Sequence, residues 1–166
     1  MVSMRFLTIL VPMLSLASAS AAAAGCRETL RPLLLQTPPD PVAVRAAHAL
    51  CTGEAASGDS DAVYRSALLH LGLLDWDVAA AIPMMRTAAR RGVPEAQYWL
   101  AWQYEEGPLL PDDRRLALRW YRQAAANEHR LALDRLAVAY RRGELGLDAE
   151  ARKAVEMRAR AERCRN

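Results

Sequence analysis

The chain has 166 residues, a length that suits one domain with a core of its own. Hydrophobic residues make up 52% of it and aromatic residues only 6%, so alanine supplies much of the apolar content, which favours an all-α protein over a β protein. The formal net charge of +3 is too small to indicate strong binding of an anionic polymer.

The first 24 residues have the layout of a secretory signal peptide. A basic residue, Arg5, precedes the apolar run "FLTILVPMLSLASA", and small residues follow it. The run is too short for a comfortable bilayer span, and no later segment is apolar enough to cross a membrane. We expect cleavage near Ala24 and a mature protein in the bacterial periplasm or secreted, where nucleic acid is not an expected partner.

The sequence "AAGC" at residues 23–26 leaves a second interpretation open. Cleavage directly before Cys26 and lipidation of that cysteine would make the protein an anchored lipoprotein. Alanine stands where such signals usually have leucine, and the apolar run ends at Leu16, well before the cysteine. Ordinary cleavage is therefore the favoured interpretation.

Residues 25–57 are predicted to form an N-terminal helical hairpin that caps the fold. Residues 27–36 and 41–50 read as two helices, and "TPPDP" between them forces a turn. In an antiparallel hairpin the start of one helix lies beside the end of the next, which places Cys26 near Cys51. We predict a disulfide between them, worth about 3 kcal/mol, over the rival pairing of Cys51 with Cys164.

Residues 58–166 contain an internal repeat. Four residues recur 36 positions later: Ala96 as Ala132, Leu100 as Leu136, Tyr104 as Tyr140, and Gly107 as Gly143. Fixed self-similarity of this length predicts stacked helical pairs. The spacing of Ala96, Leu100 and Tyr104 lines one stripe of a helix, and Gly107 is expected to end that helix in left-handed geometry.

A second helix of the repeat follows a turn at residues 108–113. Asp112 or Asp113 is expected to be its N-cap. Its buried stripe is predicted to combine small and large residues, with aromatic side chains between helices and alanines where the next helix approaches: Ala117, Trp120, Tyr121 and Ala124.

This pattern resembles the Sel-one-like repeat (SLR) family, which is related to tetratricopeptide repeats. Residues 96–128 carry its motif positions: Ala96, Leu100, Tyr104, Gly107, Asp113, Ala117, Trp120, Tyr121, Ala124 and Ala125. Residues 61–92 match less well, and residues 131–162 match in their first helix. The resemblance implies a short right-handed superhelical α/α solenoid that ends in a charged capping helix, and a non-catalytic role in protein–protein interaction.

The sequence contains no group of residues in a catalytic or metal-binding pattern. We therefore expect neither an enzyme nor a cofactor or metal site. His48, His70 and His129 stand far apart in the sequence, without acids at ligand spacing. The paired acids Glu105 and Glu106 are expected to face water. Some cysteine-rich relatives have been described as β-lactamases, but the paired cysteines of their repeats are missing here.

Four residues are predicted to bind a partner: Trp99, Trp102, Glu106 and Arg135. The two tryptophans lie one turn apart, away from the Ala96 stripe, and Arg135 occupies the place of Trp99 in the next repeat. Tryptophan and arginine often dominate binding energy. The alternative is that the tryptophans pack against the preceding repeat.

Two functions follow as hypotheses. The first is a scaffold or adaptor of the bacterial envelope that assembles exopolysaccharide or secretion machinery or regulates a membrane signalling protein, with an envelope protein as partner. The alternative is a factor that binds a glycan or peptidoglycan directly, with hydrolase activity that the sequence does not reveal.

Overall fold

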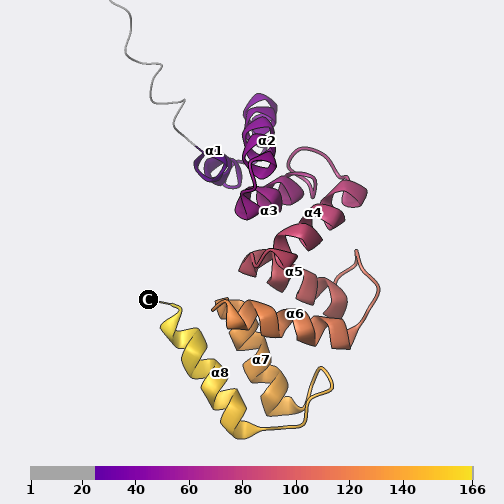
Figure 1. Cartoon of the computed structure of the whole chain (residues 1–166), viewed down its shortest axis with the longest axis vertical. Coiled ribbons are helices and arrows are strands. Elements are labelled where there is room, and N and C mark those ends of the chain that lie inside the picture. The colour runs from indigo at the N-terminus through magenta and orange to yellow at the C-terminus, as the bar shows by residue number, and fades with distance from the viewer. Residues whose placement is uncertain (1–24, 166) are drawn as a thin grey trace, which may run out of the picture.

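The computed structural model describes residues 25–165, and the signal peptide expected at residues 1–24 lies outside them. The described part is all-helical (Figure 1). Its helices are α1 (Cys26–Leu33), α2 (Pro41–Ala56), α3 (Ser60–Leu69), α4 (Val78–Arg90), α5 (Pro94–Glu105), α6 (Arg114–Ala126), α7 (Arg130–Arg142) and α8 (Ala151–Arg163). None of these helices is both long enough and apolar enough to span a membrane.

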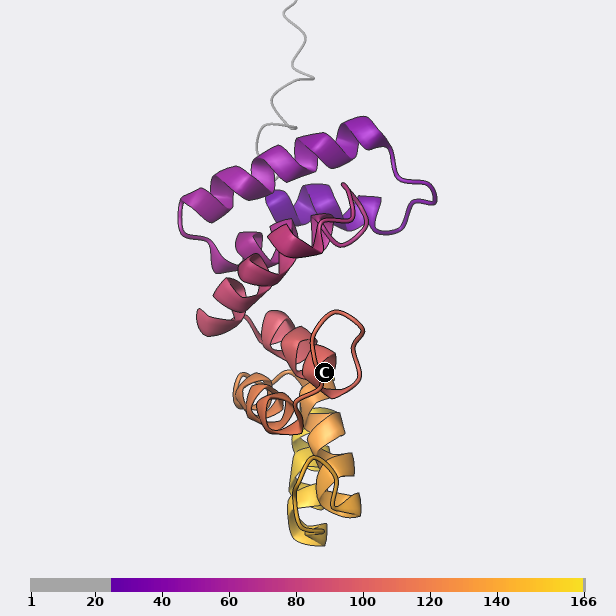
Figure 2. The same cartoon turned by 90° about the vertical axis from the view of Figure 1, so that its right-hand side faces the viewer.

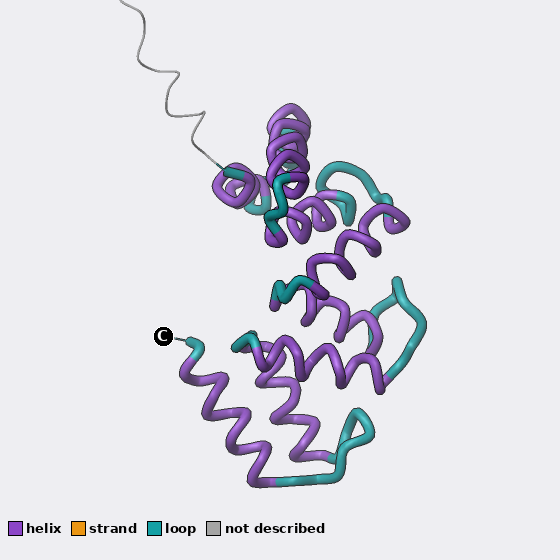
Figure 3. The backbone as a smooth tube through the Cα atoms, viewed as in Figure 1, coloured by secondary structure: helices purple, strands orange, loops and turns teal. Residues whose placement is uncertain are grey.

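The helices pack in sequential pairs, as the repeat predicts. Seen from the side, the stack is elongated, with α1 and α2 at one end and α7 and α8 at the other (Figure 2). The loops that join α3 to α4, α5 to α6 and α7 to α8 lie along one edge of the stack (Figure 3). Each helix pair therefore presents its loop in the same direction.

The predicted disulfide between Cys26 and Cys51 is confirmed, with Cα atoms 4.7 Å apart and both residues fully buried. It lies in a cluster with Leu30, Leu33, Val44 and Ala47 that also includes Ala62 and Leu69 of α3. The hairpin thus packs directly on α3, and Cys164 remains a free, half-buried thiol.

The main core lies between the repeated helices. The predicted alanine positions are fully buried, as are Leu100 and Tyr121. The small side chains let neighbouring helices approach closely, while tyrosine fills the remaining space. The prediction for Trp120 is wrong in degree, because its ring is only half-buried and the deeply buried aromatic residue of the pair is Tyr121.

The helix ends also differ from one repeat to the next. Asp113, rather than Asp112, caps α6, accepting from the backbone N–H groups of Arg115 and Leu116 at 3.0 Å each. Gly143 ends α7 in left-handed geometry with φ of 70°, as expected. The same expectation for Gly107 is wrong: a Cβ there would lie 2.5 Å from the Cα of Gln103, so glycine is needed for close approach.

One backbone hydrogen bond recurs at the base of each repeat loop. The N–H of Asp77 donates to the carbonyl of His70 at 2.9 Å, that of Asp113 to Tyr104 at 2.8 Å, and that of Glu150 to Tyr140 at 2.7 Å. These bonds align the three pairs and show that the last loop is one residue longer than the one before. Residues of α8 therefore correspond to residues of α6 one position beyond the 36-residue offset.

Candidate interaction surface

The two predicted tryptophans lie on α5 and differ in accessibility. Trp102 keeps 40% of its surface exposed, whereas Trp99 is half-buried and packs against the main core. Glu106, the C-cap residue of α5, is exposed next to them in the chain. Trp102 and Glu106 are thus open to a partner, and Trp99 contributes mainly to packing.

The structure places Arg135 in an ion-pair network rather than on a free surface. Its Nε donates to both carboxylate oxygens of Glu105, at 3.0 and 3.1 Å, and its Nη2 donates to the same group. Its Nη1 donates to Glu144 at 2.7 Å. Burial alone would lower the pKa of Arg135, but hydrogen bonds and charge from both carboxylates raise it, so the guanidinium stays charged.

Glu105 lies at the centre of this network, so the expectation that it faces water is wrong. Only 8% of its side chain is exposed, and it also accepts a hydrogen bond from the hydroxyl of Tyr121 at 2.7 Å. Burial, followed by the bond to this carboxylate, raises the pKa of Tyr121. Glu105 therefore joins α5 to α6 and to α7. Its spacing of four residues from the buried Ala101 is the sequence signal for this position.

Aromatic side chains complete the joint between α5 and α7. The ring of Tyr98 stacks on that of His129, with centroids 4.7 Å apart, and lies 5.8 Å from that of Tyr121. The Nδ1 of His129 accepts from the N–H of Ala132 at 3.3 Å and so caps α7. Burial lowers the pKa of His129, which keeps this nitrogen available as an acceptor.

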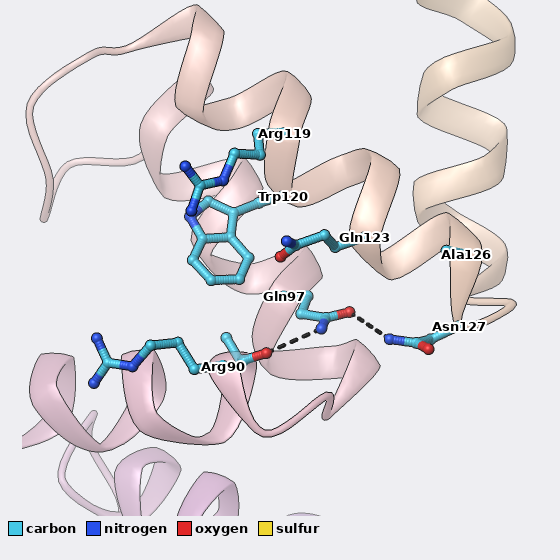
Figure 4. Close-up of a pocket in the computed structure, with 8 residues that line it drawn as sticks. Arg90, Gln97, Arg119, Trp120, Gln123, Ala126 and Asn127 are labelled. Carbon is cyan, nitrogen blue, oxygen red and sulfur yellow. Dashed lines mark hydrogen bonds between the residues drawn. The ribbon is translucent and has the colours of Figure 1, made fainter.

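A cleft of about 330 Å³ opens between α4, α5 and α6 (Figure 4). Its base is a satisfied polar chain: the amide of Gln97 donates to the carbonyl of Ala89 at 2.9 Å, and Asn127 donates to the Gln97 amide oxygen at 2.9 Å. Because these amides bond to one another, they fix the shape of the cleft and do not need a ligand.

The walls of the cleft are cationic and aromatic. Figure 4 shows Arg90 on one side and Arg119 beside the ring of Trp120 on the other. The guanidinium carbon of Arg119 lies 5.9 Å from the centre of that ring. Gln123 adds a further amide to the lining. A half-buried indole beside arginines suits a flat ligand that carries a carboxylate.

Two of the histidines, which stand far apart in the sequence, lie close together in the fold. The ring of His48 lies edge-on to that of His70, with centroids 5.2 Å apart, and His70 Nδ1 lies 3.0 Å from a carboxylate oxygen of Asp75. Within residues 25–165, no group of three or more histidine, cysteine or acidic side chains is placed to hold a metal ion.

Comparison with known proteins agrees with this architecture. The family model of the Sel1 repeat matches residues 94–129 and 130–161. A crystal structure of a Sel1 repeat protein from Oxalobacter formigenes superimposes with a TM-score of 0.65 at 30% identity, over 70% of this chain and 88% of that one. The structure of c5321, a protective antigen of uropathogenic Escherichia coli with an SLR fold, gives 0.63 at 25% identity, over 70% of this chain and 25% of that one.

A curated relative is the chitin synthase regulator SKT5 of Saccharomyces cerevisiae. It is 32% identical over 96 residues, which are 51% of this chain but only 13% of the yeast protein. The likeness is therefore to one segment of a much longer protein. The family model matches the repeat, and the Oxalobacter protein shares the fold and is matched over most of its length. The chain therefore belongs to the Sel1 repeat (SLR) family.

Proposed function

We propose that the protein is a non-catalytic scaffold of the bacterial envelope that binds a protein partner through the exposed end of α5, around Trp102 and Glu106. Sel1 repeat proteins are generally non-catalytic adaptors for protein–protein interaction. The observation that carries the proposal is the 40% exposure of Trp102 on a helix held in place by Glu105 and its partners. A rigid, exposed tryptophan is a typical anchor of an interface.

The envelope location is part of the proposal. The apolar leader at residues 1–24 supports export, and the buried disulfide suggests an oxidising compartment. A sulfur atom bonded to Cys51 cannot also carry a lipid thioether, which supports ordinary cleavage over lipidation of Cys26. The regulatory role of the yeast relative toward chitin synthase supports a partner in polysaccharide machinery.

The test replaces Trp102 with alanine and follows both folding and partner capture. Trp76, which is 67% exposed in the loop before α4, provides the matched control. Cross-linking in the native periplasm, followed by affinity purification, should recover a specific envelope protein with the parent and with Trp76→Ala, but much less of it with Trp102→Ala. Equal recovery of the partner by all three proteins would contradict the proposed site. So would a large drop in melting temperature for Trp102→Ala alone.

The cleft of Figure 4 favours a second candidate function, the binding of an acidic glycan. A sugar ring can lie on the half-buried indole of Trp120 while a uronate carboxylate meets Arg90 or Arg119. Retention on immobilised alginate measures this directly. The parent protein should be retained at low salt and both Trp120→Ala and Arg119→Ala released earlier, with Trp102→Ala unaffected. Failure of the parent to be retained would exclude this alternative for alginate.

A further inference from the structure

The last helix pair has an open groove between α7 and α8, with a volume of about 430 Å³. Most of its lining is small and apolar, and Val155 in its wall is 70% exposed. The lining residues are Ala137, Val138, Arg141, Ala151, Ala154, Val155, Arg158, Ala159 and Glu162. In the part of the chain that the structure describes, no helix covers this groove. The capping helix α8 is thus charged, as predicted, but it is not polar on all sides.

The groove corresponds to a surface that is covered in the preceding pair. Ala137 and Arg141 of α7 take the places of Ala101 and Glu105 of α5, and Ala154 and Arg158 of α8 take the places of Ala117 and Tyr121 of α6. In that pair Tyr121 is 1% exposed, only 8% of the Glu105 side chain is exposed, and α7 packs on α6 beside them. By contrast, Arg141 and Arg158 at the equivalent positions are exposed. The open groove therefore has the shape of a receptor for one more helix.

The charge in the open groove is the reverse of that in the covered one. In the covered joint, Glu105 accepts hydrogen bonds from both the guanidinium of Arg135 and the hydroxyl of Tyr121. In the open groove, both equivalent positions hold arginine. Arg141 forms no ion pair within residues 25–165, and Arg158 lies 3.2 Å from Asp134 and 3.7 Å from Glu162 with 61% of its side chain exposed. Exposed pairs of this kind are weak and can be exchanged.

We propose that the groove between α7 and α8 binds an amphipathic α-helix of a partner protein, with a carboxylate where Arg135 stands in the covered joint. The alanines of the groove let the backbone of the incoming helix approach closely, and Val138 and Val155 meet its apolar face. The carboxylate lies between Arg141 and Arg158. An arginine at the same position would meet two like charges, so the groove selects against a helix of the α7 type.

The probe is a fluorescent peptide with the sequence of residues 129–143, made in two forms: unaltered, and with Arg135→Glu. Each is titrated with the mature, disulfide-bonded protein and followed by fluorescence anisotropy. The glutamate form should bind at least about tenfold more tightly than the unaltered form, the ratio that a modest charge preference produces. Equal affinity of the two peptides, or no binding of either, would overturn the proposal.

A charge swap in the protein adds a second test. The double variant Arg141→Glu and Arg158→Glu should reverse the preference, so that the unaltered peptide binds better. Arg152→Glu, an exposed change of the same charge on α8 outside the groove lining, should leave the preference unchanged. A thermal melt shows that each variant is folded. An unchanged preference in the folded double variant would show that the peptide binds elsewhere.

A second copy of the chain is the competing occupant. If sedimentation velocity detects a dimer of the parent protein, and Val155→Glu abolishes that dimer, the groove serves self-association and the proposal is overturned. A monomer at micromolar concentration is the expected result. The inference rests on the scaffold function but uses another surface than Trp102. Absence of peptide binding to the parent protein with normal capture through Trp102, or the reverse, therefore shows which of the two proposals has failed.

Discussion

The carboxylate of Glu105 connects three helices. It belongs to α5, accepts the hydroxyl of Tyr121 from α6 and receives the guanidinium of Arg135 from α7. Only 8% of its side chain is exposed, so little water is available to replace a lost partner. Removing the carboxylate leaves the hydroxyl of Tyr121 without a partner and leaves Arg135 with only Glu144, and the loss of such partners costs more than the intact pair contributes.

Glu105→Ala should lower the free energy of unfolding by about 3 kcal/mol, near the lower end for breaking a buried pair because Arg135 is partly exposed. Urea denaturation followed by circular dichroism measures this change. The neighbouring Glu106→Ala is the control and should change stability by less than about 0.5 kcal/mol, since its side chain is exposed. Equal effects of the two substitutions would show that the network does not hold the helices together.

Tyr121→Ala should destabilise the fold more than Trp120→Ala, although tryptophan is the larger residue. Tyr121 is 1% exposed and its hydroxyl is bonded, so its loss should cost about 3–5 kcal/mol, the range for deleting a buried aromatic ring. Trp120 lines an open cleft, so truncating it should lower the free energy of unfolding by less. Urea denaturation of the two variants, measured side by side, shows which substitution lowers stability more. A larger loss of stability for Trp120→Ala would show that Trp120 belongs to the core.

Helix α7 begins at an unusual N-cap. The capping acceptor is the Nδ1 of His129, and the ring is held by stacking on Tyr98. Burial is the main cause of its lowered pKa, Arg130 lowers it further, and Glu95 opposes both. A protonated ring cannot accept a hydrogen bond, so this helix start depends on the neutral form.

Stability should therefore fall as the pH is lowered below the ordinary histidine value of about 6.5. The pKa of His129 is lower in the folded state, so the unfolded state binds more protons in this range and protonation favours unfolding. The contribution is fully present above the unfolded-state pKa. Asn at the same position caps without titrating, so His129→Asn should lose less stability between pH 7.5 and 5 in thermal melts. Identical pH profiles would remove His129 as the cause.

Gly107→Ala and Gly53→Ala should change stability in opposite directions. A Cβ at Gly107 would lie 2.5 Å from the backbone of Gln103, so the end of α5 must shift and the fold loses stability. Gly53 lies within α2 with open space around it, and alanine there should add roughly 0.5–1 kcal/mol through helix propensity. Differential scanning calorimetry of both variants tests the pair. A stabilised Gly107→Ala would show that the close approach is absent in solution.

The sequence predicts the helices and their pairing because the 36-residue repeat and the buried alanines are direct consequences of how the helices pack. It does not predict the ends of the elements or the partners of charged residues equally well. Gly107 and Gly143 look equivalent in the repeat but have different backbone geometry, since the loops after them differ in length. Glu105 and Glu106 look alike, yet one faces the interior, because a rotation of 100° separates neighbouring residues of a helix. The predicted partner site around Trp102 stays a prediction.

Two hydrophobic clusters meet at α3. Ala62 and Leu69 belong to the cluster of the disulfide hairpin, whereas Ala67 belongs to the main core. Stability in such stacked structures is the sum of each unit and its contacts with its neighbours. The N-terminal hairpin can therefore open while the pairs beyond α3 stay folded.

Reduction of the disulfide should destabilise the hairpin by about 3 kcal/mol, the chain-entropy value for a loop of this size. Amide hydrogen exchange with mass spectrometry should then show faster exchange in α1 and α2 and little change in α5 to α8. The measurement uses Cys164→Ser, so that the free thiol cannot exchange with the disulfide. Uniformly faster exchange over all helices would mean that the molecule unfolds as one unit.

The hydrogen bond at the base of each loop has a consequence for engineering. Its donor and acceptor are backbone atoms, so the loop is closed whatever side chains its tip carries. Gly146, in the last loop, is exposed and has open space around it. A foreign segment inserted there lengthens a loop that is already closed, at an entropic cost of only about 0.6 kcal/mol for each doubling of its length. The edge along which the loops gather (Figure 3) can thus display several grafted peptides side by side on one small frame.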